Sequence, residues 1–442
     1  MQTDRVTIGV CGLWHLGCVL CAAWTELGYR VVGFDPDPDR VANLSRGKPP
    51  LFEPGLEGAI TNAIQQGLLC FTDDLEELKR CDFVFIAFDT PVLEDDRCDL
   101  SPLQRTVDGL SRVLRDEAVV IVSSQTPAGT CLRFRSQLRQ ANPTVELVYS
   151  PENLRLGQAI ECYLKPGRII LGAETEAAQR KTINLFSTIE AQVIAMNLCS
   201  AEMVKHAINS FLANSIVFAD HMADLCEMTG ANIRDVVKGM KSDARIGEKA
   251  YLSPGIGFSG GTLGRDLQVL SQLRAEQGRK AMMCDVIIRF NSERKQVIVK
   301  RIAGLCNGRL KGKVIAVLGL TYKPGTSTLR RSLPLEIVRL LIEKGASIKA
   351  YDPRADYGEM DRPVDFTICQ SIEDALRDSD LALLLTEWPQ FKDYDWGRCG
   401  DYMKRKQLFD TKNFLADNRL EENGVQYFGI GLGRSSRGNQ CS

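Results

Sequence analysis

Residues 6–35, "VTIGVCGLWHLGCVLCAAWTELGYRVVGFD", decide the fold of this chain. The apolar run at residues 6–10 predicts a buried strand, and the glycines between residues 12 and 17 predict a turn. An apolar stretch that continues to about Leu27 predicts a helix, and "YRVVGFD" predicts the next strand. Strand, helix and strand in this order form a βαβ unit, so we expect the two strands to run parallel in one sheet.

The turn after the first strand has the spacing of a dinucleotide-binding site. Such a site needs the pattern G-x-G-x-x-G, followed by an acidic residue at the end of the second strand that binds the adenosine ribose. Gly12 and Gly17 fit the first and third glycines and Asp35 fits the acid, whereas Trp14 stands at the middle glycine. The middle glycine lets the pyrophosphate approach the backbone, so the indole must either swing away or cover the phosphates. The interrupted pattern therefore needs support from other motifs.

The alternation of strands and helices continues along the chain. Apolar runs such as "CDFVFIAF", "AVVIVSS", "VELVYSPE" and "RIILGA" predict a parallel, doubly wound sheet. A long helical segment runs from about Asn197 to Gly230, and a second βαβ unit begins after Gly312 with "KVIAVLGLTYKPGT". We expect an α/β protein with two Rossmann-like doubly wound domains joined by a long central helix in a helical middle domain. The expected boundaries are 1–195 for the dinucleotide-binding domain, 196–305 for the central domain and 306–442 for the C-terminal domain.

The long helical segment carries an apolar face that cannot stay alone in water. Its apolar residues recur at intervals of three and four, as in "SAEMVKHAINSFLANSIVFADHMADLCEMTG". This face belongs either in a core between domains or, in addition, in an interface between two copies of the chain. We expect a homodimer or a higher homo-oligomer.

Composition and charge exclude several classes of protein. The 442 residues include 55 basic and 56 acidic ones, and no basic run marks a nucleic-acid site. No apolar run approaches the roughly 18 residues of a membrane span, and the start lacks a signal-peptide pattern, so we expect a cytoplasmic protein without nucleic-acid or membrane partners. The 15 cysteines are scattered, and Cys18 and Cys21 lie in an apolar helix, which favours buried thiols over dithiol chemistry. The three histidines show no ligand spacing, so we expect no metal.

Nine further segments follow one another in a specific order. They are "RGKPPLFEPGL" at 46–56, "FIAFDTP" at 85–91, "SPENLRLGQA" at 150–159, "KPGRIILG" at 165–172, "AEMVKHAINSFLANSI" at 201–216, "RIGEKAYLSPGIGFSGGTLGRD" at 245–266, "VLGLTYKPGTSTLRRS" at 317–332, "TEWPQF" at 386–391 and "FDTKNF" at 409–414. In this order they resemble the UDP-glucose/GDP-mannose dehydrogenase family, whose members oxidise the C6 hydroxymethyl group of a nucleotide sugar with NAD. The resemblance covers nearly the whole chain and implies NAD as cofactor and a nucleotide sugar, such as a UDP-hexose, as substrate.

Residue by residue, the resemblance implies three groups of site residues. The NAD site is expected at Gly12, Trp14, Gly17, Asp35, Arg40, Thr90, Gln125 and Arg330. The nucleotide-sugar site is expected at Leu154, Arg245, Gly257 with its glycine-rich neighbours, Lys323 and Lys412. The catalytic positions are Lys205, Asn209, Asp266, Glu152 and Thr262. Lys205 and Asn209, one helical turn apart, are implied to hold the reacting oxygen, and Asp266 to orient a water that takes the alcohol proton.

The main departure from the family lies in "GIGFSGGTLGRD" at residues 255–266, where Thr262 aligns with the family's catalytic cysteine. The family uses that thiol to trap an aldehyde, which is then oxidised to a thioester and hydrolysed. A threonine hydroxyl is a much weaker nucleophile at neutral pH. Leu156 and Gln125 also replace a family glutamate and threonine, whereas the groups that activate the alcohol remain.

This pattern of loss predicts an NAD-dependent oxidoreductase that transfers hydride from an alcohol of a UDP-hexose without the thioester stage. The reaction would be a two-electron oxidation or a redox epimerisation. One alternative is a complete UDP-glucose 6-dehydrogenase that forms the uronic acid through a displaced cysteine or the aldehyde hydrate. Another alternative is a non-catalytic nucleotide-sugar-binding protein, for which Trp14 is the main argument.

Overall fold

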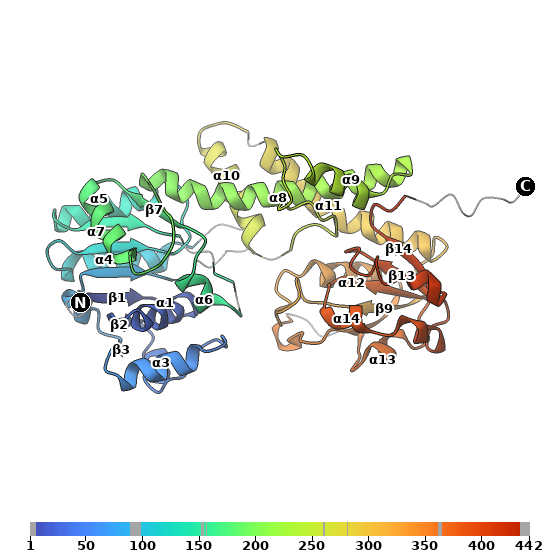
Figure 1. Cartoon of the computed structure of the whole chain (residues 1–442), viewed down its shortest axis with the longest axis horizontal. Helices are drawn as coiled ribbons and strands as arrows, with labels where there is room; N and C mark the ends of the chain where they lie inside the picture. Colours follow the sequence, from blue (N-terminus) through green and yellow to red (C-terminus); the bar gives the residue numbers. More distant parts are fainter. Residues whose placement is uncertain are drawn as a thin grey trace, which may run out of the picture. The chain divides into compact units, whose positions relative to one another are not determined.

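A computed structural model describes residues 6–88, 99–151, 154–155, 157–259, 261–280, 282–360 and 365–433. The chain divides into two compact units, Met1–Ile208 and Asn209–Ser442. Each unit is built on its own sheet, and the helix α8 (Leu198–Thr229) passes from the first unit into the second (Figure 1). Among the described helices, none combines the length and the apolar character that crossing a bilayer requires.

The first unit contains an eight-stranded sheet in the order β3-β2-β1-β4-β5-β6-β7-β8. The order reverses between β1 and β4, which makes the sheet doubly wound as predicted. Every neighbouring pair is parallel except β6 and β7, which are antiparallel, so the expectation of a wholly parallel sheet is wrong at this pair. An antiparallel neighbour needs no crossover back to the start of β6, so after α6 the chain enters β7 in the opposite direction. The strands are β1 (Thr7–Cys11), β2 (Arg30–Phe34), β3 (Leu69–Thr72), β4 (Phe83–Ile86), β5 (Val119–Val122), β6 (Glu146–Tyr149), β7 (Ile169–Ala173) and β8 (Val193–Met196).

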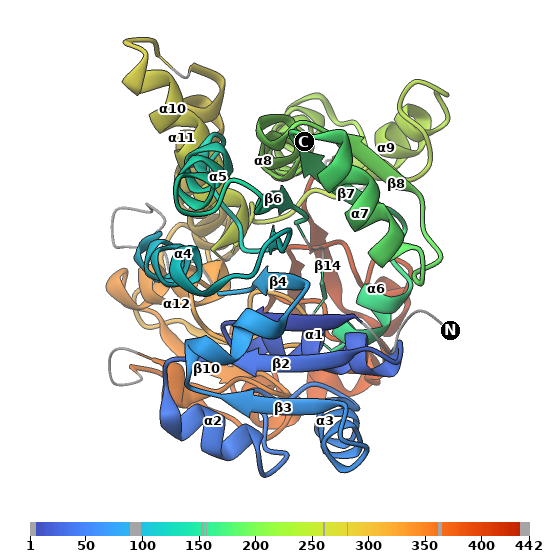
Figure 2. The ribbon, with the colours of Figure 1, turned by 90° about the vertical axis from the view of Figure 1, so that its left-hand side faces the viewer.

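Helices cover both faces of this sheet (Figure 2). One apolar core lies under α1, α3, α6 and α7, and a second lies under α4, α5 and the start of α8. The helices are α1 (His15–Glu26), α2 (Pro38–Leu44), α3 (Leu56–Gln65), α4 (Ser101–Val113), α5 (Thr130–Ala141), α6 (Ala159–Leu164) and α7 (Glu176–Phe186), with the 3₁₀ helix η2 (Leu75–Arg80).

Helix α1 is buried along its whole middle, because its sequence contains almost no polar residues to face water. Cys18 and Cys21 are buried free thiols in this helix, as the apolar pattern predicts. Burial raises the pKa of Cys18 to about 12 and that of Cys21 well above its ordinary value. Both side chains therefore act as small apolar core residues.

The second unit contains a six-stranded sheet in the order β11-β10-β9-β12-β13-β14, and all its described pairs are parallel. Its strands are β9 (Val314–Leu318), β10 (Ser347–Tyr351), β11 (Thr367–Ile368), β12 (Leu381–Leu384), β13 (Gln407–Asp410) and β14 (Gln426–Gly429). Its helices are α9 (Ile233–Lys241), α10 (Thr262–Glu276), α11 (Met282–Leu305), α12 (Leu333–Glu343), α13 (Ile372–Leu376) and α14 (Pro389–Asp393), with the 3₁₀ helices η3 (Tyr357–Glu359), η4 (Trp396–Asp401) and η5 (Leu420–Asn423).

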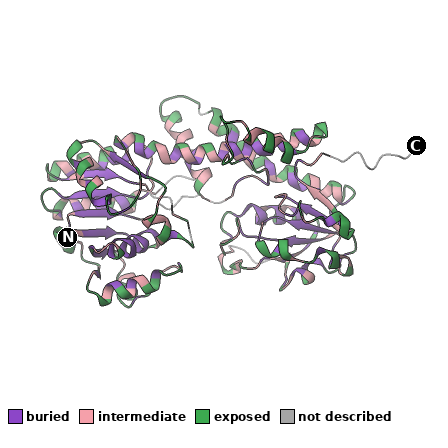
Figure 3. Cartoon of the chain, viewed as in Figure 1, coloured by how far each residue is buried: buried purple, intermediate pink, exposed green. Residues whose placement is uncertain are grey.

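Buried residues concentrate in the strands of each sheet and in the inner faces of the helices (Figure 3). In the second unit, α11 and α12 cover one face of the sheet, while α13, α14 and η4 cover the other. The two doubly wound sheets and the long helix α8 confirm the predicted fold class. The domain boundaries expected near residues 195 and 305 stay a prediction.

Candidate active site

The turn between β1 and α1 has the tight backbone that a pyrophosphate site requires. Gly12 adopts φ +91°, and a Cβ there would lie 2.9 Å from the backbone nitrogen of Phe88. A Cβ on Gly17 would lie 1.8 Å from the carbonyl oxygen of Gly12. Both positions therefore need glycine, and the turn leads directly into the N-terminus of α1, which favours a bound anion.

Asp35, at the end of β2, is buried beside this turn and accepts a hydrogen bond of 2.7 Å from the Leu13 N–H. Arg40 of α2 donates from Nη1 to both carboxylate oxygens of Asp35, at 3.0 and 2.9 Å. The Arg40 guanidinium also lies 5.3 Å from the centroid of the Trp14 indole, which is 40% exposed. The structure thus brings Trp14, Arg40 and Asp35 together at the position where a dinucleotide site binds the adenosine ribose.

Glu53 links the dinucleotide turn to a second segment of the first unit. It accepts hydrogen bonds from the N–H groups of Gly157 (3.0 Å) and Ala159 (2.9 Å), and its Oε2 lies 2.9 Å from His15 Nε2. Burial alone would raise the pKa of Glu53, but these partners reverse the effect, so the pKa is lowered. The carboxylate therefore fixes the start of α6 next to the segment that contains Leu154. Sequence reasoning missed this role, although Glu53 stands in the motif "RGKPPLFEPGL".

The remaining predicted residues of the first unit lie after its strands and on α8. Leu154 packs against the core under α1, and Gln125 is half-buried after β5. Lys205 is half-buried on α8. Thr90 and Glu152 lie outside the described residues.

Glu202, which sequence reasoning also missed, fixes the segment that follows Gln125. It is fully buried on α8 and accepts hydrogen bonds from the Thr126 hydroxyl (3.0 Å), the Gly129 N–H (2.6 Å) and the Cys131 N–H (2.8 Å). A buried carboxylate with three donors is a strong positional restraint. The backbone at Gln125 is therefore held between β5 and α5.

In the second unit, Asn209 of α8 and Asp266 of α10 are in direct contact. Asn209 Nδ2 donates a hydrogen bond to Asp266 Oδ2, and both side chains are buried. Thr262 is the first residue of α10 and is exposed, four residues before Asp266 and thus on the same face of the helix. The structure brings together the predicted amide and carboxylate, with Thr262 one turn away along α10.

A pocket of about 250 Å³ is lined in part by the glycine-rich segment that precedes Thr262. Two predicted substrate residues, Gly257 and Lys412, line this pocket. Lys412 Nζ lies 4.0 Å from Glu387 Oε2, so the pocket contains a cation beside a carboxylate. The complete lining is Ile216, Tyr251, Ser253, Pro254, Gly255, Gly257, Glu387, Lys412 and Phe414. Tyr251, Glu387 and Phe414 were not predicted, although each stands in a motif that carried the resemblance.

The backbone around Lys412 is fixed by the buried carboxylate of Asp410. This carboxylate accepts hydrogen bonds from the Lys412 N–H (2.9 Å), the Leu415 N–H (2.7 Å) and the Tyr427 hydroxyl (3.0 Å). Burial raises the pKa of Asp410, and the hydrogen bonds oppose the rise. Asp410 thus orients the strand end from which Lys412 projects.

Three other predicted residues are exposed and do not line this pocket. Arg245 pairs with Asp243 at 2.7 Å. Lys323 lies with its Nζ 5.5 Å from the ring centroid of Tyr322, and Arg330 lies in the same loop after β9. Their roles in binding stay predictions.

Comparison with known proteins places the whole chain in one family. Residues 6–190, 199–293 and 316–417 match, respectively, the NAD binding, central and UDP binding domains of the UDP-glucose/GDP-mannose dehydrogenase family. A UDP-glucose 6-dehydrogenase of Pseudomonas aeruginosa is 33% identical, over 96% of this chain and 97% of that protein. One from Bacillus subtilis is 31% identical, over 96% and 93%.

A solved structure of a protein from this family is also similar to this chain. A UDP-glucose dehydrogenase from Pyrobaculum islandicum superposes with a TM-score of 0.86 at 28% identity, covering 98% of this chain and 99% of that one. The domains matched include the two that bind the cofactor and the UDP moiety, so an NAD-dependent enzyme is favoured over a non-catalytic binding protein. This chain belongs to the UDP-glucose/GDP-mannose dehydrogenase family and is an NAD-dependent oxidoreductase of the nucleotide-sugar dehydrogenase type.

Proposed function

We propose that this enzyme oxidises the C6 alcohol of a UDP-hexose to the uronic acid. The main support is the similarity, over nearly the full length, to proteins named UDP-glucose 6-dehydrogenase. This similarity favours complete oxidation, which the sequence left open as an alternative, over the expected two-electron reaction. The buried hydrogen-bonded pair of Asn209 and Asp266 is the observation in the structure that carries the proposal.

Different residues of the chain would have different roles in the first oxidation. Asn209 and Lys205 would stabilise the developing alkoxide, and Asp266, oriented by Asn209, would direct a water that accepts the proton. The turn at residues 12–17, with Asp35 and Arg40, fits the pyrophosphate and ribose of a dinucleotide. NAD bound there supplies the hydride acceptor for both oxidations.

The second oxidation must work with Thr262 in place of the thiol. Water can add to the C6 aldehyde to give a hydrate, which is already at the right stage to become the acid by loss of a hydride and a proton. No covalent bond to the enzyme is needed, and Asp266 would again direct the proton transfer. Thr262 would then lie near the reacting group without acting as a nucleophile.

Product analysis with NAD and candidate UDP-hexoses tests this proposal. We expect uronic acid with two NADH per sugar, retained in Thr262→Ala, and faster acid formation in Thr262→Cys, where the thioester route becomes possible. Acid formation that disappears in Thr262→Ala would contradict the hydrate route. Absence of NADH with every UDP-hexose would contradict the proposed substrate.

The exposed Thr262 at the position of the thiol supports a second candidate function. In this candidate the enzyme stops after one hydride transfer or returns the hydride to the other face of the sugar. The same experiment distinguishes the candidates, because an aldehyde or ketone appears with one NADH per sugar and an epimer appears with none.

We also propose that two copies of the chain associate through α8. Phe211, Phe218, Leu225 and Met228 are between 38% and 79% exposed on this helix, and the first three are seven residues apart. Apolar residues at this spacing form one stripe, which is typical of a helix that packs against another. A cytoplasmic location belongs to the same proposal, and the free cysteines of the described chain fit a reducing compartment.

A further inference from the structure

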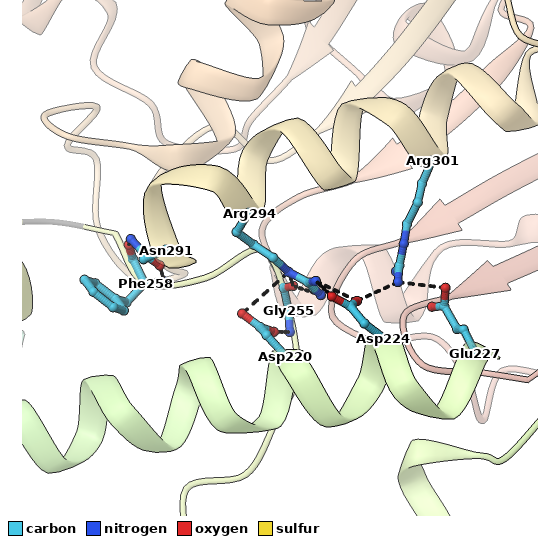
Figure 4. Close-up of polar contacts among 8 residues, drawn as sticks. All are labelled: Asp220, Asp224, Glu227, Gly255, Phe258, Asn291, Arg294 and Arg301. Atoms are coloured by element: carbon cyan, nitrogen blue, oxygen red, sulfur yellow. Dashed lines mark hydrogen bonds and ion pairs between the residues drawn. The ribbon is translucent and has the colours of Figure 1, made fainter. Parts of the chain in front are cut away.

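The backbone of residues 255–258, which we call the 255–258 loop, is held at both of its ends by side chains of α8 and α11 (Figure 4). This loop supplies Gly255 and Gly257 to the pocket that also contains Lys412. It also leads directly towards Thr262 and α10. Its shape therefore determines part of the pocket wall.

At the first end, an acidic and a basic side chain form hydrogen bonds with the backbone of Gly255. The Gly255 N–H donates to Asp220 Oδ1 at 2.5 Å, and the Gly255 carbonyl accepts from Nε and Nη2 of Arg294, each at 3.1 Å. The side chains of Asp220 and Arg294 are fully buried, and Asp220 Oδ2 lies 3.7 Å from Arg294 Nε. Moving Gly255 away would leave buried charged groups without these partners, which is costly.

Arg294 is itself oriented by a chain of ion pairs between the two helices. Its Nη1 donates to both oxygens of Asp224 at 2.7 Å. Arg301, two turns further along α11, pairs with Asp224 at 2.8 Å and with Glu227 at 2.7 Å. Glu227 in turn accepts the Gly431 N–H at 2.6 Å. The guanidinium of Arg294 therefore has a fixed geometry that a lysine ammonium cannot reproduce.

At the second end, one amide side chain binds both polar groups of Phe258. Asn291 Oδ1 accepts the Phe258 N–H at 2.8 Å, and Asn291 Nδ2 donates to the Phe258 carbonyl at 3.1 Å. Between the two ends, Gly257 adopts φ +94°, and a Cβ there would lie 2.3 Å from Asn291 Oδ1. The loop and α11 thus fit closely only when residue 257 has no side chain.

We propose that Asn291 and Arg294, together with Asp220, are positioning residues that hold the 255–258 loop in its substrate-binding shape before the sugar nucleotide arrives. The identity of the ligand rests on the proposed function, whereas the holding of the loop rests on the contacts above. A loop fixed in advance lowers the ordering cost of binding, so loss of these contacts weakens binding without a new clash. Asn291 is the sharper test, because its replacement leaves every buried ion pair in place.

The test compares Asn291→Ala, Asn291→Asp and Arg294→Lys with Ser292→Ala. Ser292 is an exposed neighbour on α11 whose hydroxyl donates to the Arg289 carbonyl of its own helix. Hydrogen exchange in residues 255–259 of the unliganded protein reports the loop, and calorimetry reports the affinities for UDP-glucose and NADH. We expect faster exchange in the loop and a roughly tenfold weaker UDP-glucose affinity in Asn291→Ala, with a smaller effect in Asn291→Asp, which keeps one of the two hydrogen bonds. Affinity for NADH should stay within about twofold, because its predicted site lies in the other unit.

Unchanged exchange in residues 255–259 of Asn291→Ala would overturn the positioning role, whatever the activity. If Arg294→Lys does not fold, the two Asn291 variants decide the question. Faster loop exchange in a protein whose wild type binds no UDP-hexose would support the positioning role and contradict the proposed function. The experiment therefore distinguishes failure of the positioning role from failure of the proposed function.

Discussion

Asp35 accepts hydrogen bonds both from the Leu13 N–H and from the Arg40 guanidinium, and we expect this pairing to influence which dinucleotide the enzyme prefers. A carboxylate at this position accepts the ribose hydroxyls of NAD and repels the 2′-phosphate of NADP. We expect Asp35→Ser to weaken NAD binding and to narrow the preference for NAD over NADP, because Arg40 then becomes available to a phosphate. Fluorescence titration with NADH and NADPH measures both affinities. An equal decrease in affinity for NADH and for NADPH would contradict this role of Arg40.

Asp220 gives the stability of the enzyme a pH dependence of unusual sign for an aspartate. Burial raises its pKa from the ordinary 3.8 to about 6, against the opposing effects of Arg294, the Gly255 N–H and Lys412, while Asp224 adds to the rise. The folded state therefore takes up a proton near pH 6, whereas the unfolded chain takes it up only near its ordinary pKa. The contribution of Asp220 to the free energy of unfolding therefore increases as the pH falls from above 6 towards 4, and it is lost again as the pH rises through 6.

The corresponding variant is Asp220→Asn, which cannot titrate. We expect the free energy of unfolding of the wild type, relative to this variant, to increase between pH 7 and pH 5. Denaturant titrations at several pH values check this, with Ser292→Ala as a control that should follow the wild type. A constant difference across this range would show that Asp220 does not change protonation there.

At the scale of elements, the glycine-rich stretch of residues 255–266, which runs into α10, contains two glycines with opposite roles. Gly257 has φ +94° and no room for a Cβ, whereas Gly264 lies inside α10 with no neighbouring atom within 4 Å of a Cβ. We expect Gly257→Ala to destabilise the protein by about 1–3 kcal/mol, since it combines backbone strain with a clash against Asn291. Gly264→Ala should be neutral or stabilising by up to about 1 kcal/mol. Thermal unfolding of the pair measures the difference, and similar melting temperatures would contradict this view of the loop.

Elements are also the scale at which sequence reasoning succeeded best. The alternation of apolar strands and helices is local, so both doubly wound sheets and α8 could be predicted. The antiparallel pairing of β6 and β7 could not, because no local pattern states the direction in which the chain returns. Among the site residues, Asn209 and Asp266 could be inferred from motifs, and the structure puts them in contact.

The residues that the sequence did not reveal share one property, which is that their partners are far away along the chain. Glu53 binds His15 across 38 positions, Asp220 binds Gly255 across 35, and Glu202 binds Thr126 across 76. An isolated acidic residue in a helix or loop has the same appearance whether it faces water or a buried backbone N–H. Only the packing of the elements distinguishes these cases.

At the scale of the whole molecule, the apolar stripe on α8 predicts self-association. Phe218→Glu would place a charge in the middle of this stripe, so we expect it to shift the protein towards monomer. Light scattering coupled to size exclusion measures the mass, and Glu293→Gln, a charge change at an exposed residue of another helix, α11, is the control. An unchanged mass in Phe218→Glu would place the interface elsewhere or exclude one.

The burial of the cysteines decides how this enzyme can be labelled for spectroscopy. The thiolate is the form of cysteine that attacks a maleimide reagent. Burial raises the pKa of Cys11, Cys21 and Cys131 well above the ordinary value, and that of Cys18 and Cys81 to about 12. Cys70, on β3, is the exposed cysteine of the described chain. With Cys98 and Cys441, which lie outside the described residues, replaced by serine, a fluorophore should attach first at Cys70. A dye at Cys70 would then report on the first unit while every core thiol stays in place.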